Sequence, residues 1–118
     1  MGDSKDLKDR TKRFAAMVIR TVEKLPRTIA SEVIVRQLVR ASTSIGANYR
    51  AACRARSPAE FIAKLQIALE ESDEAMYWME LMLDLEMLES GMLKNAIKEA
   101  NELTAIFVSA LKTSRREQ

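Results

Sequence analysis

Apolar residues recur at steps of three and four along most of the chain, and this spacing is interrupted at three places. Because such steps return to the same side of an α-helix, each uninterrupted run predicts one helix. Pro26 ends the first run, since the residue before a proline is displaced from helical geometry. Glu89-Ser90-Gly91 ends the third. The expected helices cover about residues 4–24, 28–54, 58–88 and 91–112, followed by a frayed polar tail, 113–118.

Residues typical of helix starts stand at the expected breaks. Thr28 is the expected N-cap of the second helix, and Ser90 can cap the fourth. Ser57 precedes Pro58 and stands three residues before Glu60, which is the pattern of a capping box with proline in the first turn. Connections this short force successive helices to run antiparallel. The predicted fold is therefore all-α, an antiparallel up-down-up-down four-helix bundle.

The composition suits a single helical domain spanning residues 1–118. Of its 118 residues 47% are hydrophobic, and it has only three glycines and two prolines, so the apolar content suffices for one core. No apolar run is long enough to cross a membrane, and the charged start is unlike a signal peptide. The lone Cys53 excludes an internal disulfide and suits a reducing compartment. We therefore expect a cytoplasmic protein with no membrane partner.

Two kinds of catalytic chemistry are disfavoured by the residue inventory. The chain has no histidine, which removes the commonest general base and the commonest metal ligand. A carboxylate-bridged metal site in a helical bundle needs Glu-x-x-His pairs, so the acidic stretch 70–74 cannot form one. Cys53 lacks a histidine partner that would activate it as a nucleophile. We expect no enzyme activity, no metal and no cofactor.

The second and third expected helices each carry a second apolar stripe beside the stripe that would form the core. A surface helix of a monomer needs about 100° of apolar arc, and here the arc is nearer twice that. The core stripes hold Ala30, Ile34, Leu38, Ala41, Ile45, Asn48 and Ala52, and Phe61, Leu65, Ala68, Leu69, Ser72, Met76, Met79 and Leu83. The second stripes hold Val35, Val39, Ser42, Gly46, Tyr49 and Cys53, and Ile67, Trp78, Leu81 and Leu85.

Either a wide core or an interface between subunits would explain the surplus stripes. We favour the interface, because these side chains left exposed would form an aggregation-prone patch. Glu71 and Glu74 border the stripe that contains Trp78, and we expect them to meet Arg50 or Arg54 within a subunit or from a neighbour. The expected interface residues are Val35, Val39, Gly46, Tyr49, Cys53, Ile67, Glu71, Glu74, Trp78 and Leu81.

The formal net charge of +2 conceals an uneven distribution along the chain. Residues 1–64 hold 14 Lys and Arg against 6 Asp and Glu, whereas residues 65–118 hold 5 against 11. Such polarity can serve nucleic-acid contact, pairing between subunits, or solvated surface alone. The candidate nucleic-acid contacts are Lys5, Lys8, Lys12, Arg13, Arg20, Arg36, Arg40, Arg50 and Arg54.

A family resemblance adds to this picture. The signature Ser44-Ile45-Gly46-Ala47-Asn48-Tyr49-Arg50 is followed about 30 residues later by Glu74 and Tyr77-Trp78-Met79. This pairing resembles the bacterial four-helix-bundle proteins called the 23S rRNA intervening-sequence protein family, over about residues 7–112. Members commonly carry a glutamate directly after the arginine, where this chain has Ala51.

The resemblance implies a left-handed antiparallel bundle that assembles as a cyclic homopentamer and has no enzyme activity. A distant relative is the accessory protein of diversity-generating retroelements, which binds nucleic acid and a polymerase through a basic pentamer. Two functions therefore stay open at this point. One is a homo-oligomeric scaffold that binds RNA or DNA, and the other is a homo-oligomeric adaptor whose partner is another protein.

Overall fold

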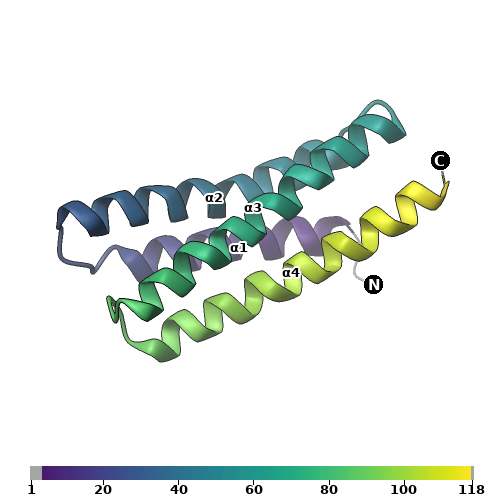
Figure 1. Cartoon of the computed structure of the whole chain (residues 1–118). Helices are drawn as coiled ribbons and strands as arrows, with labels where there is room; N and C mark the ends of the chain where they lie inside the picture. Colours follow the sequence, from purple (N-terminus) through teal and green to yellow (C-terminus); the bar gives the residue numbers. More distant parts are fainter. Residues whose placement is uncertain (1–3, 118) are drawn as a thin grey trace.

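The computed structural model describes residues 4–117, which form four helices: α1 (Ser4–Val22), α2 (Ile29–Cys53), α3 (Pro58–Asp84) and α4 (Ser90–Glu117). Successive helices run antiparallel in an elongated bundle with extents of 47 × 22 × 21 Å (Figure 1). α2 and α3 pack along each other, as do α3 and α4, while α1 packs mainly on α2 and less on α4. The chain is thus the predicted all-α, up-down four-helix bundle.

The core is a continuous column of apolar side chains from all four helices. Phe14 of α1 and Phe107 of α4 are its largest fully buried residues, and Leu38, Ile45 and Leu65 are equally buried. In α2 the predicted core stripe is wrong at its first position, since Ala30 is exposed before the helix enters the bundle. In α3 some residues of the predicted core stripe are only half-buried: Phe61, Leu69, Met76 and Leu83. Ala75 and Met82, which were not predicted for the core, are fully buried.

The N-caps of α2 and α3 explain where these helices begin. The Thr28 hydroxyl accepts from Ser31 N at 3.0 Å, and Ser31 Oγ accepts from Thr28 N at 2.9 Å, which closes a reciprocal capping box. Ser57 Oγ likewise accepts from Glu60 N at 3.1 Å. The Glu60 carboxylate accepts from the backbone of Arg56 at 3.2 Å. The Glu60 side chain therefore binds the backbone N–H of the residue before the N-cap, whereas the predicted capping box has it bind the N–H of Ser57 itself.

The end of α3 differs from the prediction, because the helix stops at Asp84 rather than at about Leu88. Glu86 takes a left-handed backbone conformation with φ of 54°. Its N–H donates to Leu83 O and that of Met87 donates to Met82 O, both at 3.1 Å, which is the Schellman arrangement of a helix end. Because a glycine normally occupies the left-handed position, the pattern of residue types did not reveal this end.

The end of α4 also differs, since it continues to Glu117 instead of fraying after residue 112. The side chain of Arg115 donates to Gln66 Oε1 of α3 at 2.9 Å, which ties the last turn to the bundle. Arg115 and Arg116 also lie at the helix C-terminus, where positive charge complements the helix dipole. Ser90 is the first residue of α4, so it lies in the helix rather than before it.

The second stripe of α2 faces α1. A Cβ placed on Gly46 would lie 3.0 Å from Thr11 Oγ1 and 3.3 Å from Thr11 Cβ, so the missing side chain lets the two helices approach closely. Ser42, one turn earlier, is fully buried. Its hydroxyl has no hydrogen-bond partner among the residues that the structure describes. Because α2 has a neighbour on each side, it needs two apolar stripes even within one chain.

Polar residues near the core form two separate pairs. Asn48 Nδ2 donates to Ser44 Oγ at 2.8 Å and to Ser44 O at 3.0 Å, within α2. Ser72 Oγ lies 2.7 Å from Thr104 Oγ1, which joins α3 to α4. Only the second pair fixes the register between helices. Over residues 4–117, none of the helices is both long and apolar enough to cross a membrane.

Candidate interaction surfaces on α2

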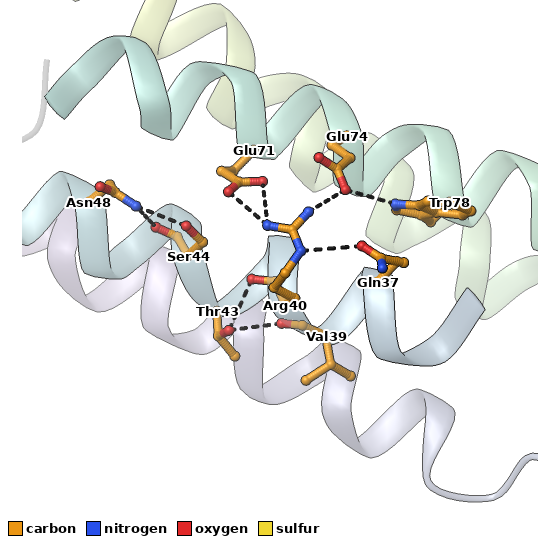
Figure 2. Close-up of polar contacts among 9 residues, drawn as sticks. All are labelled: Gln37, Val39, Arg40, Thr43, Ser44, Asn48, Glu71, Glu74 and Trp78. Carbon is orange, nitrogen blue, oxygen red and sulfur yellow. Dashed lines mark hydrogen bonds and ion pairs between the residues drawn. The ribbon is translucent and has the colours of Figure 1, made fainter. Parts of the chain in front are cut away.

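The first surface centres on Arg40, whose guanidinium lies between two carboxylates of α3 (Figure 2). Arg40 Nη1 donates to Glu71 Oε2 at 3.0 Å, and Nη2 donates to Glu74 Oε2. Glu74 Oε2 also accepts from Trp78 Nε1 at 3.0 Å. We call Arg40, Glu71 and Glu74 the Arg40 cluster. It spans the seam between α2 and α3 on the outside of the bundle.

The electrostatics of this cluster favour the charged forms of Arg40 and Glu74. The hydrogen bond from Trp78, together with Arg40, holds the pKa of Glu74 below its usual value. The same carboxylates raise the pKa of Arg40. Glu71 is the least exposed member, with 15% of its side chain accessible, against 48% for Arg40. A largely covered carboxylate needs a cation beside it, which explains why the arginine lies across the seam.

The predicted pairing of Glu71 and Glu74 with an arginine of α2 is correct in kind, but the partner is Arg40, and Arg50 and Arg54 do not fill this role. The antiparallel hairpin explains the difference. Arg40 lies about as far before the α2–α3 turn as Glu71 lies after it, whereas Arg54 borders the turn itself. A helical-wheel projection identifies the face on which a residue lies but does not give its position along the helix axis.

Large apolar side chains continue the same outer surface toward the start of α2. Ile29 and Val33 are 86% and 55% exposed, and helical steps place them in the stripe that contains Arg40. Leu85, the C-cap of α3, is 54% exposed and lies two turns after Trp78. Tyr77, 56% exposed, meets the Trp78 ring edge-on with centroids 5.0 Å apart. We define the α2–α3 face as Ile29, Val33, Gln37, Arg40, Ile67, Glu71, Glu74, Trp78, Leu81 and Leu85.

The structure corrects part of the predicted interface. Tyr49 is buried, and its ring lies 6.0 Å from that of Phe107, so it belongs to the core. Gly46 faces Thr11 of its own chain. Val35 and Val39 line a groove of about 490 Å³ between the end of α1 and the start of α2. Tyr49 therefore serves the core and Gly46 the contact with α1, while Val35 and Val39 lie on the side of α2 that faces α1 rather than α3.

The remaining predicted interface residues are half-buried. Ile67, Trp78 and Leu81 lie on the α2–α3 face. Cys53 is a free thiol beside a hollow near the α2–α3 turn, together with Tyr49 and Phe61. The α2–α3 face also includes Ile29 and Val33, in the first two turns of α2, which were not among the predicted interface residues. Leu85 was recognised as apolar but was not counted among them either.

The second surface is a groove of about 470 Å³ between α1 and α2. Four cations border it, two from α1 and two from the C-terminal end of α2, and its floor contains Gly46, where α1 approaches α2 closely. We call it the α1–α2 groove. It is lined by Lys8, Asp9, Thr11, Lys12, Ala15, Thr43, Gly46, Ala47, Arg50 and Arg54.

The nine predicted nucleic-acid contacts thus separate into groups. Lys8, Lys12, Arg50 and Arg54 converge on the α1–α2 groove, and Lys5 continues the lysine stripe one turn earlier. Arg36 lies in the other groove, beside Glu23 and Glu32. Arg40 is paired with carboxylates. Arg13 and Arg20 are exposed elsewhere along α1.

A second arginine cluster was not predicted. Arg10 of α1 donates from Nε to Glu99 at 2.7 Å and from Nη2 to Glu102 at 2.8 Å, which joins α1 to α4. The pKa of Arg10 is raised, chiefly by the hydrogen bond to Glu99. We call these residues the Arg10 cluster. The signal that could have revealed it is the spacing of Glu99 and Glu102, three residues apart as are Glu71 and Glu74.

Comparison with known proteins decides the family. The sequence profile of the 23S rRNA-intervening sequence protein matches residues 5–109. The chain belongs to the 23S rRNA-intervening sequence protein family. A crystal structure at 1.70 Å of a protein with unknown function from the S23 ribosomal protein family of Bacteroides thetaiotaomicron is similar, with 33% identity and a TM-score of 0.85. The similarity covers 92% of this chain and 97% of that chain. No curated protein matches.

The signature that suggested the 23S rRNA-intervening sequence family now has a structural explanation. Ile45 and Tyr49 enter the core, Gly46 allows the approach of α1, and Ser44 binds Asn48. Arg50 borders the α1–α2 groove. Three residues of the signature thus serve packing within the bundle: Ile45, Gly46 and Tyr49.

Proposed function

We propose that this chain is a non-enzymatic scaffold that assembles with copies of itself through the α2–α3 face. The observation that carries the proposal is the continuity of that face. Ile29, Val33 and Leu85 are more than half exposed beside Trp78 and the Arg40 cluster. Burying these side chains against a second copy would remove apolar area from water at about 25 cal/mol per Å². The polar cluster at the centre would fix the orientation of the copies.

A cyclic pentamer is the assembly that we expect, and the number five rests on the resemblance to pentameric bundles. A cyclic assembly repeats the same surface around an axis, so one face per subunit must meet a complementary region of the next. The α2–α3 face supplies both apolar residues and charges of both signs. The free thiol of Cys53 is consistent with the reducing cytoplasm, where we place the protein.

Val33→Glu tests the assembly. Val33 is 55% exposed within one subunit, so the substitution leaves the fold intact but places an uncompensated charge in the proposed interface. The matched control is Ala105→Glu on the exposed surface of α4. Light scattering at micromolar concentration should report an oligomer for the wild type and the control and a smaller species for Val33→Glu. A wild-type protein that scatters as a 13.3 kDa monomer would refute the proposal.

Nucleic-acid binding is the second candidate function, and the α1–α2 groove is the observation that favours it. A single groove offers four cations, whereas a ring of subunits would offer several such grooves to one polymer. Binding should weaken steeply with salt, because each neutralised phosphate releases counterions. A mobility-shift assay with structured RNA at about 50 mM and about 200 mM salt tests this. Over this range, a protein that makes about six to ten phosphate contacts loses affinity by several orders of magnitude. An intact oligomer that binds no nucleic acid at the lower salt would favour the protein adaptor.

A further inference from the structure

We propose that the α1–α2 groove is an RNA site that holds the sugar–phosphate backbone rather than the bases. This inference deepens the second candidate function and rests on it. The groove lies on the side of α2 that faces α1, so it is separate from the α2–α3 face proposed for assembly. One subunit can therefore use both surfaces.

The cations of the groove are arranged in two rows. Lys8 and Lys12 are one turn apart on α1, and Arg50 and Arg54 are one turn apart at the end of α2. Each row repeats its charge about every 5–6 Å along its helix. Neighbouring phosphates of a nucleic-acid strand have a comparable separation. Within residues 4–117 the structure shows no ion pair for these four side chains, in contrast to Arg40 and Arg10.

The floor of the groove favours close approach of a backbone. Ala15 and Ala47 each present only a methyl group, so a phosphate can come close to the helix surface while the longer cations reach it from both sides. The residues that line the groove include no aromatic ring on which a base could stack. The groove therefore suits the repeating backbone and gives little discrimination between base sequences.

Two hydrogen-bond acceptors in the groove favour RNA over DNA. Asp9 lies among the lining residues and is exposed. Thr43 is also exposed, and its hydroxyl donates to Val39 O at 2.8 Å, so the free lone pairs of the oxygen can only accept. The ribose 2′-hydroxyl is a donor that DNA lacks. Beside a DNA strand the Asp9 carboxylate would only repel phosphate.

The test uses fluorescence anisotropy with a 5′-labelled single-stranded oligouridine and with the corresponding oligodeoxyuridine, at several salt concentrations. The groove variant is Lys12→Glu with Arg50→Glu. The control is Lys94→Glu with Lys98→Glu, which changes the net charge equally at exposed positions outside the groove. Light scattering of each variant establishes whether the assembly is intact.

We expect the groove variant to lose at least about tenfold in RNA affinity, with the slope of log K against log salt reduced by about two. The control should stay within about twofold of the wild type. Asp9→Ala should tighten DNA binding and reduce the preference for RNA. Equal losses in variant and control would overturn the groove as the site. Equal wild-type affinity for both polymers would overturn the selection of RNA, and an intact oligomer that binds neither would overturn the site while leaving the assembly proposal standing.

Discussion

The two seams of α2 use the same residue type for different purposes. Toward α3, Arg40 lies between Glu71 and Glu74, because the facing turns of α3 are acidic. Toward α1, Arg50 and Arg54 stand opposite Lys8 and Lys12 across a groove. The charges on the opposite helix decide whether an arginine of this region forms ion pairs across the helix contact or leaves positive charge at the surface. One helix thereby separates a face suited to subunits from a groove suited to phosphate.

The largest expected effect concerns the close approach in the α1–α2 seam. Gly46→Leu should lower the free energy of unfolding by about 2–3 kcal/mol, because the new side chain meets Thr11 and forces α1 away. Urea unfolding measures the change. Gly91→Leu is the matched control, since a Cβ there would meet only Glu89 Oε1, at 3.5 Å. If both substitutions lower the free energy of unfolding by the same amount, the close packing of α1 on α2 does not depend on Gly46.

A smaller effect of opposite sign is expected one turn away. Ser42→Ala should raise the free energy of unfolding by about 1 kcal/mol, because it removes a buried hydroxyl without a partner among residues 4–117 and favours helix. Ser72→Ala is the control, since that hydroxyl is bonded to Thr104 and its loss should destabilise. Thermal unfolding monitored by circular dichroism compares the two. A destabilised Ser42→Ala variant would show that the hydroxyl has a stabilising role in the seam.

The smallest effects concern the two arginine clusters. Arg40→Ala and Arg10→Ala should each lower the free energy of unfolding by about 0.5 kcal/mol, since both arginines are partly solvated. Only Arg40→Ala should also weaken assembly, because the Arg10 cluster lies between α1 and α4. Dilution followed by light scattering separates the two effects. Weaker assembly in both variants would disconnect oligomerisation from the α2–α3 face.

The pKa of Glu74 gives the Arg40 cluster a pH dependence. Because the folded pKa lies below the unfolded value of about 4.3, the stabilisation is complete above that value. It is lost as the pH falls through the folded pKa. The difference in stability between the wild type and Glu74→Gln should therefore be constant near neutral pH and shrink below about pH 4. A difference that does not change with pH would show that the charge of Glu74 is not what stabilises the fold.

Periodicity and caps were sufficient to predict the four helices and the bundle. They were insufficient for features that depend on three-dimensional register. The partner of Glu71 required the height of Arg40 along the hairpin. The second stripe of α2 suggested a contact between subunits, yet Gly46 and Tyr49 serve packing within one chain. The end of α3 rests on backbone bonds around Glu86 and not on a glycine. The basic residues were recognised individually, whereas their convergence on one groove required the structure.

The Arg10 cluster also has a consequence for how the chain folds. It joins α1 to α4 across 89 residues of sequence, whereas the Arg40 cluster joins α2 to α3 across 31. Closing the shorter loop costs less chain entropy, so hairpins of successive helices can form before α1 meets α4. The contact between Arg10 and Glu99 would then be among the last to form. Transition-state analysis would find partial structure in these hairpins before α1 and α4 come together.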